Sequence, residues 1–358
     1  MLLATGNLNQ TAGEWFLQSG IQESNGGVAR YYFSDHRRNA PLTTEITAYC
    51  ASALVALYRS SSDPRYLAAA IKAARYLVEA WDADCSAMPF ERDEEDCKHS
   101  YFFDNGIIVR GLLTVWRETG RAEFLSTALK VGDSMAEDFA DEQYFSPILT
   151  LPEKSPLAYE QARWSRSPGC YQLKAALAWH ELSQVAKNER YVSFYRKLLN
   201  TSLASHDLFL PGSDTDIPVM DRLHAYSYFL EGLLPAIDDP GCADALALGI
   251  ERVAEYVYRI GPLFLRSDVL AQLLRVRLFA DQLGVVPLDE EAALREVSLM
   301  REFQSADPDA RLKGGFWFGR KQGEILPFMN PVSTAFCYQA LEMWNQKGKA
   351  ELHWQTLI

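Results

Sequence analysis

The chain has 358 residues, of which 48% are hydrophobic and 23% charged, and its formal net charge at pH 7 is -12. This composition excludes a disordered chain and is typical of a folded globular protein with a large core. The acidic balance excludes a non-specific grip on nucleic-acid phosphates or on an anionic membrane surface, because both need a basic face.

The N-terminal stretch MLLATGNLNQ has no basic region followed by a long apolar run. No segment approaches the roughly 18 apolar residues that a membrane span requires. We therefore expect a cytoplasmic protein without a membrane segment, with an exported protein whose signal peptide has been removed as the alternative. The six cysteines form no C-x-x-C pair, which favours a reducing compartment; a disulfide between Cys85 and Cys97 is the alternative for an exported protein.

Along the chain, apolar segments of helical length alternate with turn signals, and almost no run shows a clean period of two residues. The pattern predicts an all-α protein with about twelve helices. The predicted helices lie near residues 8–18, 43–59, 64–81, 104–118, 121–139, 169–184, 189–204, 221–236, 241–260, 267–283, 289–304 and 331–346.

These helices are of two kinds that alternate. Six are apolar or small on most faces, as expected for helices buried between neighbours; they begin near residues 43, 104, 169, 221, 267 and 331. The helices between them, such as DPRYLAAAIKAARYLVEAW, carry one apolar stripe and one charged face. We therefore expect an inner and an outer layer.

The starts of the inner helices recur every 44 to 66 residues, which is the length of a helical hairpin plus a loop. Six such hairpins predict a single (α/α)6 toroid domain over residues 1–358. An open superhelix of hairpins is the alternative. Four connections from an outer helix to the next inner helix are long: 82–103, 140–168, 205–220 and 305–330. Because long loops in a compact domain usually carry function, we expect the site at the N-terminal ends of the inner helices.

Four stretches resemble a known superfamily: TTEITAYCASALVALY, FFDNGIIVRGLLTVWRETGRAEFL, LHAYSYFLEGLL, and LKGGFWFG followed by NPVSTAFCYQALEMW. They look like six-hairpin glycosidases, particularly uncharacterised bacterial members associated with polysaccharides. The resemblance covers nearly the whole chain and implies the toroid and a carbohydrate role, with hydrolases, polysaccharide lyases and epimerases among the relatives. At Ala48 the sequence departs from these relatives, which usually carry glycine there.

Glu45 and Asp104 lie in or beside the first turns of successive inner helices. Each can be a residue that stabilises a helix N-terminus. Together, on one rim of a ring, they provide the paired carboxylates that glycoside hydrolysis needs.

His224 and Tyr228 are four residues apart and share one helix face. With Asp221 as the expected cap, His224 falls in the first helical turn, where the dipole keeps the imidazole neutral and basic. A histidine and a tyrosine on one sugar suit a uronate lyase or epimerase, in which one group removes a proton and another returns it. The alternative is a core histidine among core tyrosines.

Further residues on the same face are predicted to bind substrate. Arginines hold carboxylated glycans and aromatic rings stack on sugars, although loop salt bridges and core packing are the alternatives. The predicted substrate-binding residues are Tyr49, Trp164, Arg166, Arg222, Arg266, Asp268 and Trp317.

The predicted partner is an oligosaccharide or polysaccharide, and neither a metal nor a cofactor is expected. The loop with Cys85, Cys97 and His99 matches no zinc spacing, and the chain holds no phosphate-binding or nucleotide motif. Our leading hypothesis is a glycoside hydrolase that uses Glu45 and Asp104. The alternatives are a uronate lyase or epimerase that uses His224 and Tyr228, and a non-catalytic glycan-binding component of polysaccharide biosynthesis.

Overall fold

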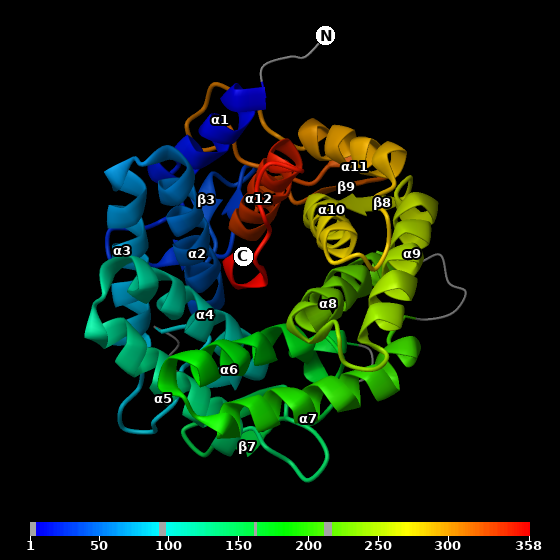
Figure 1. The fold of residues 1–358 in the computed structure, drawn as a ribbon. Helices are drawn as coiled ribbons and strands as arrows, with labels where there is room; N and C mark the ends of the chain where they lie inside the picture. Colours follow the sequence, from blue (N-terminus) through cyan, green and yellow to red (C-terminus); the bar gives the residue numbers. More distant parts are fainter. Residues whose placement is uncertain (1–4, 93–97, 161–162, 211–216) are drawn as a thin grey trace. The chain divides into compact units, whose positions relative to one another are not determined.

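The twelve predicted helices are all present in the computed structural model, which describes residues 5–92, 98–160, 163–210 and 217–358 (Figure 1). Each lies within about one turn of its predicted bounds, so the prediction of an all-α protein is confirmed. The helices are α1 (Thr5–Gln18), α2 (Thr44–Ser61), α3 (Pro64–Ala80), α4 (Phe102–Thr119), α5 (Ala122–Glu137), α6 (Gln172–Ala186), α7 (Glu189–Ser205), α8 (Ile217–Leu233), α9 (Cys242–Ile260), α10 (Ser267–Gln282), α11 (Glu290–Glu302) and α12 (Pro331–Gln346). Four short 3-10 helices accompany them: η1 (Trp164–Arg166), η2 (His206–Leu208), η3 (Leu234–Ala236) and η4 (Trp354–Thr356).

The chain forms two compact units. One, the α2–α7 unit, consists of residues 22–29 and 41–209, and the other, the α8–α12 unit, consists of residues 1–21, 30–40 and 210–358. The chain passes between the units more than once, so neither unit is one continuous segment. The single domain over residues 1–358 stays a prediction.

In the α2–α7 unit, α2, α4 and α6 form the inner layer and α3, α5 and α7 cover them. The helix α4 packs on α2, α5 and α6, and α2 and α6 also pack on α3 and α7 respectively. Twelve of the 18 residues of α4 are buried, against five of the 17 residues of α7. The predicted distinction between inner and outer helices is therefore confirmed in this unit.

The α8–α12 unit repeats this arrangement. The helix α10 packs on α8, α9, α11 and α12, and α1 packs on α12. Thirteen of the 16 residues of α10 are buried, against five of the 13 residues of α11. The core of this unit therefore lies around α10.

Two glycines of α4 allow its neighbours to approach closely. A Cβ atom on Gly111 would lie 2.8 Å from the backbone oxygen of Ala48 in α2, and one on Gly106 would lie 2.5 Å from the Cα atom of Ala175 in α6. Position 48 is therefore a point of close backbone approach, which this chain achieves with a glycine on the opposite helix.

Short strands, which the sequence pattern did not predict, pair in and around the long connections. They are β1 (Val28–Ala29), β2 (Tyr32–Phe33), β3 (Arg38–Asn39), β4 (Leu42–Thr43), β5 (Lys98–Tyr101), β6 (Ile148–Leu151), β7 (Ser155–Pro156), β8 (Phe264–Arg266), β9 (Gly319–Lys321), β10 (Glu324–Ile325) and β11 (Phe328–Met329). The antiparallel sheets have the orders β1-β4, β5-β6-β7, β10-β9-β8 and β11-β2-β3.

These strands determine where the inner helices begin. β4, β5 and β8 each end at the residue directly before an inner helix, and β11 ends two residues before α12. Because neighbouring strands are hydrogen-bonded, the helix N-terminal ends are held by paired backbone instead of free loops. Four of the residues predicted to form the site lie at these junctions: Glu45, Asp104, Arg266 and Asp268.

Among the described helices, none combines the length and the apolar character needed to span a membrane.

Candidate functional site

His224 lies in the interior of α8, and the prediction that it occupies the first turn is wrong. The helix begins at Ile217, with Pro218 as its second residue, so Asp221 is already helical. Proline favours the first turn of a helix because its fixed φ suits the helix and its missing N–H needs no partner there. The dipole of the helix end therefore does not explain the state of His224.

Two side chains of α10 hold the imidazole of His224 on one side. Its Nδ1 lies 2.7 Å from Gln272 Oε1 and 3.6 Å from an Asp268 carboxylate oxygen. The Gln272 amide nitrogen donates to the backbone oxygen of His224 at 3.4 Å, which orients the amide so that its oxygen faces the ring. Because both neighbours of Nδ1 are acceptors, Nδ1 carries the proton. Nε2 therefore has the free lone pair of a neutral base.

Burial keeps this imidazole neutral. Only 8% of His224 is exposed, and the loss of solvation, together with the positive charge of Arg266, lowers its pKa from 6.5 to about 4. Asp268 and the hydrogen bond with Gln272 act in the opposite direction but are outweighed. At neutral pH His224 is therefore an uncharged base with a fixed tautomer.

Arg266, at the end of β8, is clamped between two carboxylates. Its Nε and one terminal nitrogen bind both oxygens of Asp268 at 3.0 and 2.7 Å, and the other terminal nitrogen binds Asp221 at 2.7 Å. Three of its five N–H groups are thus engaged. Burial alone would raise the pKa of Asp268, but Arg266, His224 and the backbone N–H of Val269 lower it below its usual value. The salt-bridge alternative considered for Arg266 is thus observed. Substrate binding by Arg266 and Asp268 stays a prediction.

Tyr228 contacts His224 edge to face, with 4.5 Å between ring centroids, as their shared helix face predicts. It is 2% exposed, and both rings lie near Phe336 of α12. The Arg275 guanidinium carbon lies 4.0 Å from the centroid of the Phe336 ring, and Arg275 pairs with Glu231 of α8. His224 and Tyr228 therefore belong to a buried cluster with the Phe336 ring, against which the Arg275–Glu231 ion pair lies.

Trp317 is partly exposed and lies beside the start of α10. Its backbone oxygen accepts a 2.7 Å hydrogen bond from Ser267, and its backbone pairs with Met329. The glycines before it, Gly314 and Gly315, allow close packing. A Cβ atom on Gly314 would lie 2.2 Å from the backbone oxygen of Thr11, and one on Gly315 would lie 2.7 Å from Trp15 Nε1. Arg222, also partly exposed, lies on α8.

In the α2–α7 unit, Glu45 is the second residue of α2 and is partly exposed. The side chain of Thr43 caps this helix by accepting from the backbone N–H of Ile46, so a different residue fulfils the capping role considered for Glu45. Tyr49, one turn further along, is 1% exposed, which favours the core alternative for this residue.

Asp104, in the first turn of α4, is 7% exposed and lies near Tyr171. Burial, and then the charge of Asp104, raises the pKa of the Tyr171 phenol well above its ordinary value. The Tyr171 hydroxyl donates to the Ser167 carbonyl at 3.1 Å, and Trp164 packs edge-on against the Tyr171 ring with 5.0 Å between centroids. The structure thus links two predicted site residues, Asp104 and Trp164, through a tyrosine.

The contact between Gly111 and Ala48 relates the two predicted catalytic carboxylates. Glu45 precedes Ala48 by three residues and Asp104 precedes Gly111 by seven, and both spacings return to the same helix face. Because α3 reverses the chain between them, α2 and α4 run in the same direction. With a rise of about 1.5 Å per residue, the difference of four residues between the two spacings offsets Glu45 and Asp104 by about 6 Å along the helices. Combined with about 8 Å between the helix axes, this puts the Cα atoms of Glu45 and Asp104 on the order of 10 Å apart.

Arg166 pairs with Glu160 at 3.2 Å between partly exposed side chains, which is the salt-bridge alternative considered for it. Cys97, the partner considered for Cys85, lies outside the described residues. Within the described ranges, no three histidine, cysteine or acidic side chains are grouped as metal ligands would be.

Two residues with clear roles, Gln272 and Tyr171, were not predicted from the sequence. Gln272 is four residues after Asp268, so the same spacing that connected Tyr228 to His224 would have brought it into the site. No such spacing relates Tyr171 to Asp104. The proximity of Tyr171 to Asp104 depends on the packing of α4 on α6, which local sequence does not specify.

No family model matches the chain, and no curated protein matches it significantly. Solved structures do. The cellobiose 2-epimerase of Spirochaeta thermophila is 16% identical, with a TM-score of 0.70 over 95% of this chain and 98% of that one. A D-mannose isomerase is 9% identical, with a TM-score of 0.70 over 96% and 98% of the two chains. The unsaturated glucuronyl hydrolase of Bacillus sp. GL1 is 12% identical, with a TM-score of 0.64 over 93% and 96%.

At these identities the likeness shows the fold. It confirms the predicted (α/α)6 fold class.

Proposed function

We propose that the chain is a carbohydrate-active enzyme that moves a proton at a sugar carbon, with His224 as the base. The observation that supports this best is the state of His224: Nδ1 is hydrogen-bonded to Gln272 and lies 3.6 Å from an Asp268 oxygen, and Nε2 keeps a lone pair at neutral pH. The likeness in fold to a cellobiose 2-epimerase and a D-mannose isomerase adds to it, because such reactions change the position of a proton next to a sugar carbonyl.

In this reaction Nε2 takes a proton from the carbon next to a carbonyl or carboxylate, and the electron pair moves onto the oxygen. Return of a proton to the same carbon on the other face inverts it; return to the neighbouring carbon isomerises the sugar; loss of a substituent at the next carbon is elimination. The clamp of Asp268 by Arg266 fixes the acceptor behind Nδ1 and so keeps Nε2 as the base. Trp317 is the proposed stacking residue for the sugar ring.

The second candidate is hydrolysis by Glu45 and Asp104. Their register on the facing sides of α2 and α4 favours it, since side chains from Cα atoms on the order of 10 Å apart can bring carboxyl groups within the 5–10 Å that glycosidases use. The likeness in fold to an unsaturated glucuronyl hydrolase also supports it. A non-catalytic glycan-binding role predicts binding with no turnover.

Incubation in D2O with neutral and uronate-containing oligosaccharides separates these functions. Under the leading proposal, proton NMR shows deuterium entering a sugar carbon as epimer or isomer forms, or else an ultraviolet-absorbing unsaturated product appears, since elimination returns no proton to carbon. New reducing ends without carbon-bound deuterium would instead support hydrolysis.

Variants then assign the base. We expect His224→Gln to lower the exchange rate about 10²- to 10⁴-fold, the usual contribution of general base catalysis. His36→Gln is the matched control, because the His36 side chain is 64% exposed and removed from this cluster in sequence. Loss of turnover in Glu45→Gln and Asp104→Asn, with His224→Gln active, would transfer the assignment to the carboxylates.

A further inference from the structure

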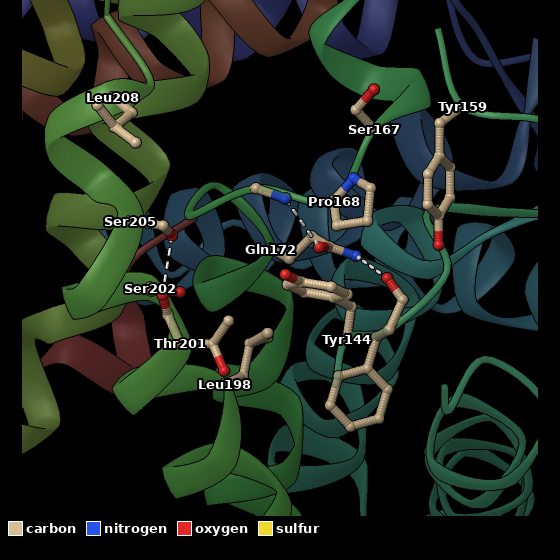
Figure 2. A pocket seen from close by; sticks show the side chains of 12 residues that line it. Tyr144, Tyr159, Ser167, Pro168, Gln172, Leu198, Thr201, Ser202, Ser205 and Leu208 are labelled. Atoms are coloured by element: carbon tan, nitrogen blue, oxygen red, sulfur yellow. Dashed lines mark hydrogen bonds between the residues drawn. The ribbon is translucent and has the colours of Figure 1, made fainter. Parts of the chain in front are cut away.

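A cavity of about 570 Å³ lies in the α2–α7 unit, between the C-terminal half of α7 and the connection that leads to α6 (Figure 2). Its volume is within the range of small-molecule sites. It is lined by Tyr144, Phe145, Tyr159, Ser167, Pro168, Gly169, Gln172, Leu198, Thr201, Ser202, Ser205 and Leu208. None of these side chains is charged.

Hydroxyl groups in this cavity differ in whether they are satisfied. Thr201 and Ser205 donate to carbonyl oxygens one turn back in α7, at 3.0 and 2.8 Å. The hydroxyl of Ser202, which is 2% exposed, has no hydrogen-bond partner among the described residues, and neither has that of Ser167. A buried hydroxyl without a partner costs about 1–3 kcal/mol, so two in one cavity indicate that the cavity is built to receive a polar ligand.

The rim of the cavity is apolar and unusually exposed. Tyr144 and Tyr159 are 43% and 49% exposed, and Leu208 is 87% exposed. Flat aromatic rings beside hydroxyl groups suit a ligand that has both C–H faces and hydroxyls. Without a cationic lining residue, a carboxylated, sulfated or phosphorylated ligand would lack its usual partner.

The walls are held in place by Gln172, which is 1% exposed. Its amide oxygen accepts from the Gly169 backbone N–H at 3.1 Å, and its amide nitrogen donates to the Phe145 carbonyl at 3.0 Å (Figure 2). The amide therefore joins two sides of the cavity, which is consequently formed before any ligand binds. A preformed site loses less entropy when it binds.

We infer that this cavity is a binding site for a neutral glycan, with the hydroxyls of Ser202 and Ser167 as hydrogen-bonding groups and the two tyrosines as stacking surfaces. It involves none of the residues assigned to proton transfer or hydrolysis, so it goes beyond the proposed function and does not require it.

Saturation-transfer NMR and calorimetry test the inference, with cellobiose, maltose and mannobiose as neutral probes at millimolar concentration. Glucuronate is the charged probe and toluene the apolar one. We expect at least one neutral disaccharide to bind, and Ser202→Ala to weaken that binding about 3- to 10-fold, as for one hydrogen bond. Ser205→Ala is the matched control, because its hydroxyl is already bonded within the helix, and should change the affinity less than twofold.

Thr201→Trp fills the cavity from a partly exposed position and should abolish binding, while circular dichroism shows that the fold is kept. The inference would be overturned if no neutral probe bound, or if toluene or glucuronate bound in place of the neutral probes. It would also be overturned if Ser202→Ala and Thr201→Trp both left the affinity for the neutral disaccharide unchanged. The same titrations on His224→Gln should retain binding, which keeps failure of this inference distinct from failure of the proposed function.

Discussion

His224 Nδ1 and Gln272 Oε1 lie 2.7 Å apart, across two helices that pack against each other. A carboxylate at position 272 would favour the charged imidazolium, whereas the neutral amide oxygen fixes the tautomer without adding charge. The pair thus provides a base that stays uncharged in a buried setting.

We expect this tautomer to be directly visible. In protein labelled with ¹⁵N-histidine, two-bond proton–nitrogen correlations should show His224 with its proton on Nδ1 and no charging above about pH 5, one unit above its pKa of about 4. His224→Gln identifies the signal by its absence. Gln272→Glu should raise the pKa of the imidazole, and the acidic limb of the activity profile should move with it. A proton found on Nε2 would contradict the geometry.

The two carboxylates that bind Arg266 should differ greatly in their effect on stability. Asp268 is buried and binds the guanidinium through both oxygens, whereas the Asp221 side chain is 44% exposed and makes one contact. Asp268→Asn leaves a buried cation partly uncompensated and should lower the free energy of unfolding by about 3 kcal/mol.

Asp221→Asn is the matched variant, because it removes the charge of the other carboxylate that binds Arg266. It should lower the free energy of unfolding by less than about 1 kcal/mol, because water screens the partly exposed Asp221. Urea titrations of both variants measure the difference. Equal losses would mean that Asp268 holds no more than a surface salt bridge does.

The packing of α4 on α2 predicts a contrast between two glycines. Gly111→Ala pushes a methyl group against the backbone of Ala48 and should cost about 1–3 kcal/mol. In Gly132→Ala the atoms nearest to the new Cβ belong to side chains, the end of Leu182 at 2.2 Å and the Tyr191 ring at 4.0 Å, so Leu182 has to shift but no backbone does. The helix gains up to about 1 kcal/mol from alanine, so this variant should cost less than Gly111→Ala. Thermal unfolding of both variants measures the contrast, and an unaffected Gly111→Ala would show that the helices do not approach this closely.

The sequence predicts the helices and their layers well because apolar periodicity repeats over many residues in each one. It predicts the start of α8 poorly: Asp221 looks like a cap, yet Pro218 lets the helix begin a turn earlier. The strands are two to four residues long, too short for a period of two to show, and their pairing joins distant segments such as 98–101 and 148–151.

In the candidate site, too, contacts within one helix are predictable from the sequence, whereas contacts between helices are not. The spacing between His224 and Tyr228 predicts their contact, because both lie on one helix. The partners of His224 on α10, and the proximity of Asp104 to Tyr171, depend on how two helices pack, which no local pattern encodes. The cavity lined by Ser202 was not predicted for the same reason.

Glu296, in α11, should make stability depend on pH in a direction opposite to His224. Its Oε1 accepts from Arg277 at 2.9 Å and from Tyr258 at 3.3 Å, while its buried Oε2 has no partner among the described residues. Burial raises the pKa of Glu296 from 4.5 to about 7, although Arg277 acts to lower it. Between these values the folded state holds the proton and the unfolded state releases it, so this contribution to stability is lost as pH rises through 7.

The lowered pKa of His224 does the reverse, since stability from that residue rises with pH between about 4 and 6.5. The opposite contributions of His224 and Glu296 to the pH dependence of stability largely cancel in the wild type. The contribution of Glu296 is therefore isolated by comparing the wild type with Glu296→Gln. We expect the free energy of unfolding of the wild type, minus that of Glu296→Gln, to fall by about 3 kcal/mol between about pH 4.5 and pH 8, since each pKa unit corresponds to about 1.4 kcal/mol. Urea titrations of both proteins across this range measure it. A difference that stays constant or rises with pH would mean that Arg277 keeps Glu296 ionised, and that the bare Oε2 is charged in the folded protein.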